Sequence, residues 1–327
     1  MDYQDRIYGD FQISDTVILE LINSKTLQRL KNIDQAGYFE PHFPGTAHSR
    51  FEHSFGVYLL LKKYNAPIEE QIAGLIHDVS HSVFSHCIDY VLDAGSEEKH
   101  DHQDNVFDEF VRKSEIPAIL VKFGFDLERI LNDENFPLKE KKLPDLCADR
   151  IDYSLRTGVM FKVINQTEAR ELLENLVAEK GSWIFKNFEF AEKYAKLFMH
   201  FNSNYYAGLS SAVMFRTIGD YLRHALKKKY INESDLYSTD EKVLSKISQF
   251  HNQDEELARL FQRMNDGKNF INNPENYDAK VCCKSRVVDP LFKSESGIKR
   301  ISEVDERWRE IIKRELKPKC YFIKFGA

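Results

Sequence analysis

The stretch that decides the fold is Gly74-Leu75-Ile76-His77-Asp78-Val79-Ser80-His81. Its apolar residues recur at helical spacing and predict a helix over residues 68–81 with one buried stripe. Burying a histidine beside an aspartate is costly unless the two pair or bind a metal. Asp78 would project about 100 degrees away from His77 on such a helix, so one ion could reach both side chains only at the helix edge. A buried hydrogen bond between them is the simpler alternative.

Histidine is concentrated around this stretch. Eight of the 11 histidines fall within residues 42–102, which indicates a local need for imidazole. The segment His48-Ser49-Arg50-Phe51-Glu52-His53-Ser54 contributes further candidates. Because Arg50 and His53 are three residues apart, a helix over residues 49–63 would place them on one face. That face would offer a metal ligand beside a cation that can bind an anion.

A third polar segment contains three aspartates. Asp145, Asp149 and Tyr153 recur at intervals of four, which predicts one face of a helix, while Asp152 and Arg156 are expected to pair on another face. Spacing alone does not choose between Asp149 and Asp152 as a metal ligand. Surface ion pairs would account for all three acids as well.

Together these segments supply two imidazoles and two carboxylates. Such a set nearly balances a divalent cation and leaves positions open for water and substrate, as catalytic sites do. Nitrogen and oxygen donors suit Mn, Fe, Ni, Co, Zn or Mg, as one ion or two.

Composition bounds the class of protein. Hydrophobic residues make up 42% of the 327, which supplies a sizeable core, and the net charge of -6 makes a nucleic-acid polymer an improbable partner. The apolar run from Val57 to Leu61 is far shorter than the roughly 20 residues that cross a bilayer. The N-terminus lacks a secretory signal, and the five scattered cysteines suit reduced thiols. We therefore expect a cytoplasmic protein with no membrane span.

Apolar spacing predicts a mostly α-helical body followed by a small C-terminal α+β lobe. The main helices are expected at residues 49–63, 68–81, 84–92, 103–111 and 145–155, with a long pair within 189–228. Residues 183–185 and 188–190 could form a hairpin or the start of a helix, and the irregular segment 37–45 is expected to line a pocket. In the tail, short strands near Val281, Val287, Ile298 and Tyr321 flank a helix near 303–315. We expect a helical domain of residues 1–230 and an appendage of residues 231–327 packed on it.

These motifs, in this order, resemble the H…HD…D pattern of the HD superfamily and look closest to the deoxynucleoside triphosphate triphosphohydrolases. The likeness rests on motifs within residues 43–54, 74–86 and 149–153, and it implies an HD-domain helical bundle. It also implies four metal ligands, which are His53, His77, Asp78 and Asp149. The choice of Asp149 follows the family, whose ligand precedes a basic residue and lies four residues before a tyrosine.

The resemblance further assigns substrate and proton-transfer roles. The implied substrate-binding residues are Gln35, Arg50, Arg150 and Tyr153, with the arginines on phosphates and the glutamine on the sugar. The implied catalytic residues are His81, His86, Asp89 and His102, with His100 as a rival for the last and Asp89 orienting His86. The chain departs from the family at Arg150, where lysine is common. It departs again at Ser210-Ser211-Ala212, where a Tyr-Gln pair that recognises deoxyribose is not evident.

The resulting hypothesis is hydrolysis of a phosphate ester or anhydride, of a nucleotide or deoxynucleotide, by metal-activated water. Three alternatives stay open: a phosphatase for a non-nucleotide substrate, a di-iron HD oxygenase that uses the additional histidines, and a nucleotide-sensing protein without turnover. The expected partner is a small phosphorylated molecule, and a homodimer is a candidate assembly.

Overall fold

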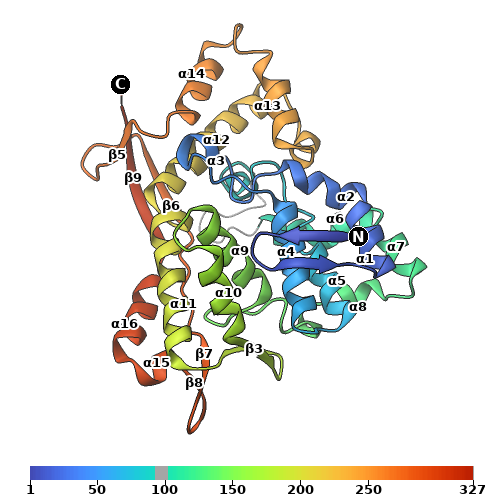
Figure 1. The fold of residues 1–327 in the computed structure, drawn as a ribbon. Coiled ribbons are helices and arrows are strands. Elements are labelled where there is room, and N and C mark those ends of the chain that lie inside the picture. The colour runs from blue at the N-terminus through green and yellow to red at the C-terminus, as the bar shows by residue number, and fades with distance from the viewer. Residues whose placement is uncertain (93–101, 327) are drawn as a thin grey trace.

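Among the residues that the structure describes, helices form the larger part, as predicted, and three small sheets complete the fold (Figure 1). The computed structural model describes residues 1–92 and 102–326. The α-helices are α1 (Thr16–Asn23), α2 (Lys25–Arg29), α3 (Phe39–His42), α4 (Arg50–Lys63), α5 (Ile68–Ile76), α6 (His102–Lys113), α7 (Ile116–Lys122), α8 (Leu127–Leu131), α9 (Ala148–Met160), α10 (Gln166–Glu174), α11 (Phe188–Phe201), α12 (Leu209–Lys227), α13 (Asp240–Ser248), α14 (Glu255–Met264), α15 (Ile301–Val304) and α16 (Glu306–Glu315). In the described ranges, no helix is both long and apolar enough to cross a membrane.

Helix α4, which carries His53, begins within one residue of its predicted start. Ser49 caps α4 by accepting a hydrogen bond from the Glu52 amide, and Glu52 accepts one from the Ser49 amide in return, which forms a capping box. Helix α5 then packs closely against α4. A Cβ on Gly74 of α5 would lie 2.5 Å from a Leu61 methyl group, so a larger residue there would have to displace the Leu61 side chain.

Two hydrophobic cores hold these helices. The first core is formed by residues of α1, α4, α5, α9, α10 and α11. The second surrounds α12 and includes residues of α13, α14, the strands β6 (Ala279–Cys283) and β9 (Lys319–Phe325), and the short 3-10 helix η2 (Ser85–Tyr90). Residues on both sides of position 230 share the second core, so the domain boundary there stays a prediction.

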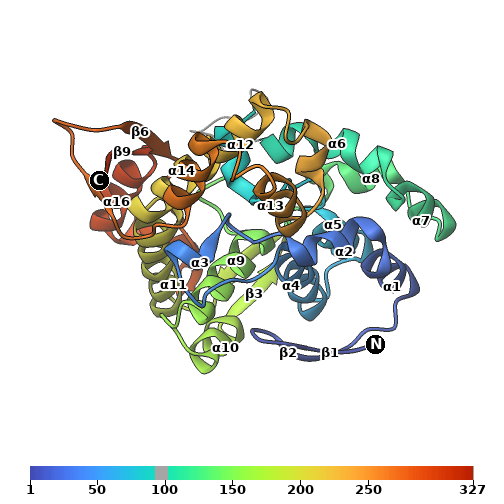
Figure 2. The ribbon, with the colours of Figure 1, turned by 90° about the horizontal axis from the view of Figure 1, so that it is seen from above.

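Short sheets tie the C-terminal residues to the body. The hairpin of β1 (Asp2–Asp5) and β2 (Gly9–Gln12) lies on the opposite side of the molecule from the sheet β5-β9-β6, in which β5 is Phe270–Asn272 (Figure 2). The sheet β3-β4-β7-β8 joins β3 (Leu176–Glu179) and β4 (Ser182–Phe185) to β7 (Leu291–Ser294) and β8 (Gly297–Arg300). Strands β5 to β9 and helices α15 and α16 thus supply the α+β structure predicted for the C-terminal region, and β7 and β8 extend a sheet that begins in the body.

Several local expectations need correction. Residues 183–185 do form a strand, but they pair with β3, and Phe188 instead begins α11. Helix α9 begins at Ala148, which leaves Asp145 outside it. Residues 84–92 form only the 3-10 helix η2, because Phe84 adopts a left-handed conformation with φ of 54°.

The expectation of five reduced thiols is also wrong. Cys282 and Cys320 stand opposite each other on β6 and β9 and form a disulfide. They are 38 residues apart in sequence, so only the register of the sheet brings them together. Cys87, Cys147 and Cys283 are free and buried.

Candidate active site

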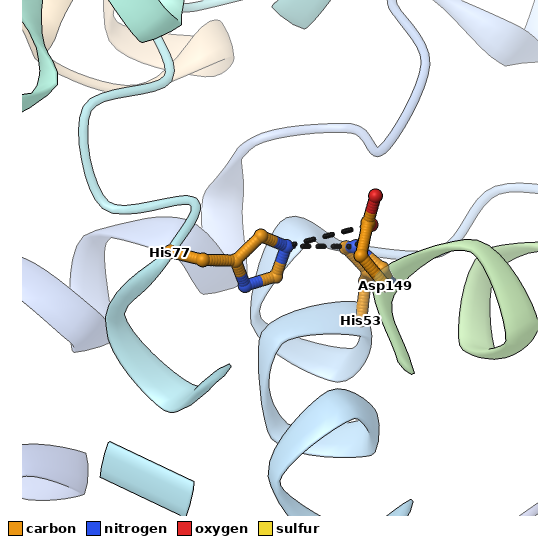
Figure 3. Close-up of side chains that lie close together, drawn as sticks. All are labelled: His53, His77 and Asp149. Atoms are coloured by element: carbon orange, nitrogen blue, oxygen red, sulfur yellow. Dashed lines mark hydrogen bonds and ion pairs between the residues drawn. The ribbon is translucent and has the colours of Figure 1, made fainter. Parts of the chain in front are cut away.

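Three elements bring the candidate metal ligands together. His53 lies in α4, His77 follows the end of α5, and Asp149 lies in the first turn of α9 (Figure 3). Asp78 directly follows His77. The helix predicted over residues 68–81 ends early, at Ile76, and the turn that follows changes the direction of the next side chains. Asp78 therefore reaches both histidines. Its Oδ1 lies 3.4 Å from His77 Nε2, and its Oδ2 lies 3.7 Å from His53 Nε2.

Each imidazole has one nitrogen bound to the protein and the other facing a shared space. His53 Nδ1 donates to Asp152 Oδ2 at 2.8 Å, and His77 Nδ1 donates to the Gly74 carbonyl at 2.8 Å. The two Nε2 atoms lie 3.2 Å apart, and Asp149 Oδ1 lies 2.9 Å from that of His53 and 3.5 Å from that of His77. The ligand atoms of His53, His77 and Asp149 all lie within 4.8 Å of one another. This donor set, with its outer nitrogens held in place, fits a divalent metal.

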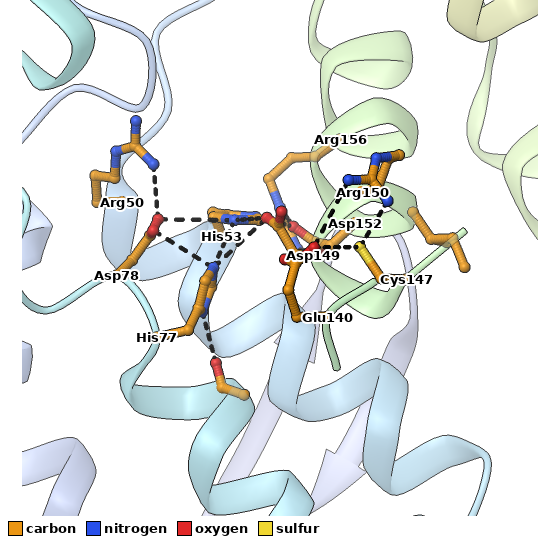
Figure 4. Close-up of polar contacts among 12 residues, drawn as sticks. Arg50, His53, His77, Asp78, Glu140, Cys147, Asp149, Arg150, Asp152 and Arg156 are labelled. Carbon is orange, nitrogen blue, oxygen red and sulfur yellow. Dashed lines mark hydrogen bonds and ion pairs between the residues drawn. The ribbon is translucent and has the colours of Figure 1, made fainter. Parts of the chain in front are cut away.

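The geometry distinguishes Asp149 from Asp152, between which sequence spacing could not choose as the metal ligand. Asp152 is fully buried and binds the outer nitrogen of His53, while Arg156 Nη2 donates to Asp152 Oδ1 at 2.8 Å, as predicted (Figure 4). Asp149 faces the inner nitrogens and lines a cavity. Asp149 is therefore the better candidate for a ligand, and Asp152 is placed to orient His53.

Asp78 also pairs with Arg50. Arg50 Nη1 donates to Asp78 Oδ2 at 2.7 Å, and Arg50 Nε donates to Ser85 Oγ at 2.9 Å (Figure 4). Burial would raise the pKa of Asp78, but the charge of Arg50 and the neighbouring His77 and His81 hold it well below the usual value. The Asp78 carboxylate therefore stays ionised although it is buried.

Protons balance the remaining charge of the cluster. Burial would lower the pKa of His53, but hydrogen bonds to Asp149 and Asp152 raise it to about 9. Burial would raise the pKa of Asp149, but hydrogen bonds with His53 and His77 hold it well below the usual value. Because metal ligands must be deprotonated, a divalent cation bound here would displace the His53 proton.

A cavity of about 450 Å³ opens beside the cluster. All four residues expected to bind substrate line it, namely Gln35, Arg50, Arg150 and Tyr153. Arg150 is already engaged, because its Nη1 donates to the Asp145 carbonyl at 2.7 Å and its Nη2 lies 3.7 Å from Glu140 Oε1. Its Nε is buried without a hydrogen-bond partner among the described residues.

The residues expected to act in proton transfer divide into two groups. His81 and His86 line the cavity, and Asp89 stands behind His86 with 3.4 Å between Oδ2 and Nδ1, a long contact. Burial and the charge of Arg50 hold the pKa of His86 well below its usual value. His102 does not line the cavity. Its amide donates to Asp89 Oδ1 and its Nε2 lies 3.1 Å from the Tyr237 hydroxyl oxygen, while His100 lies outside the described residues.

Sequence reasoning identified part of an aromatic wall, formed by Phe39, Phe43, Phe161 and Tyr205, all of which line the cavity. The expectation that segment 37–45 lines a pocket is confirmed, since it supplies Phe39 and Phe43. The contacting rings of the aromatic wall have centroids 4.4 to 5.8 Å apart. Phe161 directly follows α9 and Tyr205 lies in the turn after α11, and no spacing in the sequence predicted these two rings.

Three cations of the cavity were missed altogether. Lys139 lines the cavity and pairs with Asp133. Lys284 and Arg286 line it from the segment after β6. The sequence offered one signal, because the last two cations alternate with the smaller residues Cys283, Ser285 and Val287. Spacing cannot say which cavity an extended segment faces.

Comparison with known proteins gives consistent matches. The HD domain family matches residues 50–157. The protein YdhJ of Bacillus subtilis is 36% identical over 95% of this chain and 94% of its own length. The metal-dependent phosphohydrolase cns2 of Cordyceps militaris is 35% identical over 54% of this chain and 50% of its own length.

Two further matches are more distant. The deoxynucleoside triphosphate triphosphohydrolase SAMHD1 of Mus musculus is 30% identical over 43% of this chain and 26% of its own length. A crystal structure of a phosphohydrolase from Bacteroides thetaiotaomicron superposes with a TM-score of 0.73, at 18% identity, over 100% of both chains. At that identity the likeness shows the fold alone.

Proposed function

Because this chain belongs to the HD-domain family of metal-dependent phosphohydrolases, we propose that it hydrolyses a phosphate ester or anhydride of a nucleotide. The observation that carries the proposal is the convergence of His53, His77, Asp78 and Asp149 beside a cavity that also presents arginines. These four residues would hold a divalent metal, which would supply an activated water and polarise the scissile P–O bond.

Arg50 is the residue best placed to bind a phosphate beside that cluster. Its Nη2 is buried and has no hydrogen-bond partner in the described part of the chain, although Nη1 and Nε are both bonded. A buried guanidinium nitrogen without a partner is costly, and a phosphate oxygen would satisfy it. Arg50 would thus stabilise the charge that develops on phosphorus oxygens during hydrolysis.

His86 is the candidate for proton transfer to the leaving oxygen. It lines the cavity, and its low pKa leaves it neutral before substrate binds. A phosphate anion bound beside Arg50 would offset the positive charge that holds this pKa down. Asp89 would then orient the protonated ring.

Two unsatisfied acceptors support a nucleoside as the rest of the substrate. His48 Nδ1 lies 3.0 Å from the Thr46 carbonyl, so it carries the hydrogen. Burial lowers the pKa of His48 to about 4, which leaves a neutral ring whose Nε2 is an acceptor. This Nε2 and Gln35 Oε1 are buried without hydrogen-bond partners among the residues described. A sugar hydroxyl or a base amino group could donate to them while the base packs on the aromatic wall.

The alternatives gain less support. An oxygenase would need a second set of ligands from the additional histidines, yet the groups of candidate ligands in residues 1–92 and 102–326 do not include His81, His86 or His102. A substrate without a nucleoside would leave the aromatic wall and the two acceptors unexplained. The likeness to SAMHD1, a deoxynucleoside triphosphate triphosphohydrolase, favours nucleotides.

A phosphate-release screen tests the proposal. The full chain, loaded in turn with Mn, Fe, Ni, Co, Zn or Mg, is assayed on ribonucleotides, deoxynucleotides and small phosphoesters. We expect nucleotide turnover that is lost, together with metal content, in Asp149→Ala. Asp145→Ala is the matched control, because Asp145 lies on the same segment, pairs with Arg300 and does not line the cavity. Absence of release from every substrate, or full activity in Asp149→Ala, would refute the proposal.

A further inference from the structure

The turn at Phe84 and Ser85 carries backbone strain beside the candidate active site. Both residues adopt left-handed conformations, with φ of 54° and 45°, and both are fully buried. This conformation is unfavourable for any residue with a Cβ, and most of all for a bulky one such as phenylalanine. Such strain persists only where the surroundings fix it, and it is concentrated at functional sites. The turn directly precedes His86, which lines the cavity.

The other positive φ values of non-glycine residues have ordinary explanations. In the described ranges they occur just after helices α4, α9 and α12 or in the turn between β3 and β4, at Asn65, Lys162, Lys229 and Lys180. Left-handed residues are common at helix ends and in hairpin turns. Neither a helix end nor a hairpin explains the strain at Phe84 and Ser85, so other contacts must hold it.

Asp240, the first residue of α13, supplies the main contact. Its Oδ1 accepts a hydrogen bond from the Phe84 amide at 2.8 Å, and its Oδ2 accepts one from the Asp34 amide at 2.8 Å. The Val83 amide adds a hydrogen bond to the Leu236 carbonyl at 2.8 Å. The region expected only as an appendage thus fixes the strained turn of the body.

Ser85 connects this turn to Arg50. Its hydroxyl donates its one hydrogen to the Asp34 carbonyl, so the oxygen is left to accept from Arg50 Nε, which lies at 2.9 Å. Because Asp240 binds the amides of both Asp34 and Phe84, these residues and Ser85 form a closed ring of covalent and hydrogen bonds. The hydroxyl that receives Arg50 Nε is therefore fixed in position and in direction.

The orientation of the Arg50 guanidinium depends on that hydroxyl. Nη1 donates to Asp78 Oδ2 at 2.7 Å, and this bond alone would leave the planar group free to turn about it. The second bond, from Nε to Ser85, fixes the plane. The remaining nitrogen, Nη2, has no hydrogen-bond partner among the described residues, and it is the atom proposed to bind phosphate.

Asp240 is an unfavourable choice for a purely structural contact. Burial raises the pKa of its carboxyl to about 7, although the amides of Asp34 and Phe84 and the charges of Arg29 and Arg50 act against this rise. Because an aspartate in the unfolded chain has a pKa near 4, keeping this group ionised at neutral pH lowers the stability of the fold. Natural proteins accept such losses of stability mainly at functional positions.

We propose that Asp240 is a positioning residue for the hydrolysis, which holds the turn at Phe84 and Ser85 against Asp34 and so directs the Arg50 guanidinium toward the phosphate. The inference rests on the proposed function, because it assigns Asp240 a part in the same site. Asp240 itself does not line the cavity and acts through Arg50. Its loss should therefore remove part of the contribution of Arg50 and nothing more.

A double-mutant cycle on kcat/KM tests this assignment, with the metal-loaded full chain and the nucleotide that the phosphate-release screen identifies. Asp240→Ala should lower kcat/KM by about tenfold, as when one hydrogen bond to a charged group is weakened. The variant with both Asp240→Ala and Arg50→Ala should be no slower than Arg50→Ala alone, whereas independent effects would multiply. Glu241→Ala is the matched control, since it removes the same charge from the exposed neighbouring position in the first turn of α13. It should leave kcat/KM unchanged.

A second variant keeps the cycle decisive should Asp240→Ala fail to fold. Asp240→Asn retains the volume and one acceptor oxygen, so it should show a smaller loss with the same dependence on Arg50. Ser85→Ala removes the link to Arg50 itself, and adding Asp240→Asn to it should cause no further loss. Wild-type kcat/KM in Asp240→Ala, or losses from either Asp240 variant that multiply with those of Arg50→Ala, would overturn the positioning role.

Binding of inorganic phosphate measures the same link without turnover. In calorimetry on the as-purified full chain, phosphate affinity should fall by about tenfold in Asp240→Ala, stay unchanged in Glu241→Ala, and be equal in Arg50→Ala with and without Asp240→Ala. Phosphate binding that Arg50→Ala weakens and Asp240→Ala does not would overturn the positioning role and leave the proposed function standing. Absence of turnover on every nucleotide would overturn the proposed function, and the phosphate cycle would still decide the role of Asp240. A wild-type chain that binds no phosphate would overturn that role as well.

Discussion

Asp152→Asn removes one charge behind the metal cluster and almost no volume. Asp152 Oδ2 accepts from His53 Nδ1 at 2.8 Å and from Arg156 Nε at 3.1 Å, while Oδ1 accepts from the Tyr8 hydroxyl at 2.9 Å and from Arg156 Nη2 at 2.8 Å. An asparagine can keep only one acceptor oxygen. If its amide faces His53, then Nδ1 must accept a hydrogen bond, and the ring proton moves to Nε2, where the metal would bind.

Two magnitudes follow for Asp152→Asn. The wrong tautomer of His53 should weaken metal affinity by about 10 to 100-fold, as is typical when the partner of a ligating histidine is lost. Removing one partner of a buried ion pair costs about 3 to 5 kcal/mol, and we expect the lower end because Asp5 Oδ2 still lies 3.2 Å from Arg156 Nη2. Since domains are typically stable by about 5 to 15 kcal/mol, the variant should fold.

Metal titration by calorimetry and unfolding in urea separate the two effects of Asp152→Asn. We expect weaker metal binding, and turnover that excess metal partly restores. A variant that loses stability but binds metal as tightly as wild type would show that Asp152 only supports packing, and the orientation argument would be wrong.

Three further changes test other parts of the structure. A Cβ at Gly56 would lie 2.0 Å from a carboxylate oxygen of Asp152. Gly56→Ala should therefore lower the free energy of unfolding, measured in urea, by about 3 kcal/mol, although alanine has the better helix propensity. An unchanged free energy of unfolding would contradict this close packing. Burial raises the pKa of Asp34 to about 8 and that of Asp240 to about 7. Because these pKa values exceed those of the unfolded chain, the stability that these two groups contribute should fall as pH rises from about 4 to about 8. Asp34→Asn should remove about 2 kcal/mol of the fall between roughly pH 6 and pH 8, and an unchanged difference between urea unfolding at these two pH values would count against it. Arg50→Ala should slow phosphate release by about 10 to 1000-fold with metal content intact, and loss of the metal instead would mean that Arg50 mainly supports the cluster.

The parts of the site that the sequence predicted are those governed by local rules. Helix α4 starts at Arg50 because Ser49 and Glu52 form a capping box that is visible in the sequence. The pairing of Asp152 with Arg156 follows from their spacing of four residues. Local spacing was sufficient in both cases because neither feature depends on a distant segment.

The end of α5 depends on such a segment and was therefore missed. Arg29 Nη2 donates to the carbonyls of Val79 and His81, both at 2.7 Å. These bonds satisfy carbonyl groups after Ile76 and stabilise the turn, which a periodic apolar pattern does not reveal. The early end of the helix is what turns His77 and Asp78 toward one space.

The choice of Asp149 over Asp152 shows a second limit on predicting the site from the sequence. Both residues lie in α9 within one turn, and each contacts His53, one at Nε2 and the other at Nδ1. Which of them faces the cavity depends on how α9 packs against α4. Sequence spacing carries no information on that packing, so only a likeness to known enzymes could choose between them.

The late position of Lys284 and Arg286 in the chain affects the order in which the cavity is assembled. His53, His77, Asp78 and Asp149 all precede residue 150, whereas Lys284 lies in a segment joined to β6, whose partner β9 ends at Phe325. Domains fold from the N-terminal side as the ribosome releases the chain. A nascent polypeptide would therefore bring its candidate metal ligands together long before Lys284 and Arg286 complete the lining of the cavity.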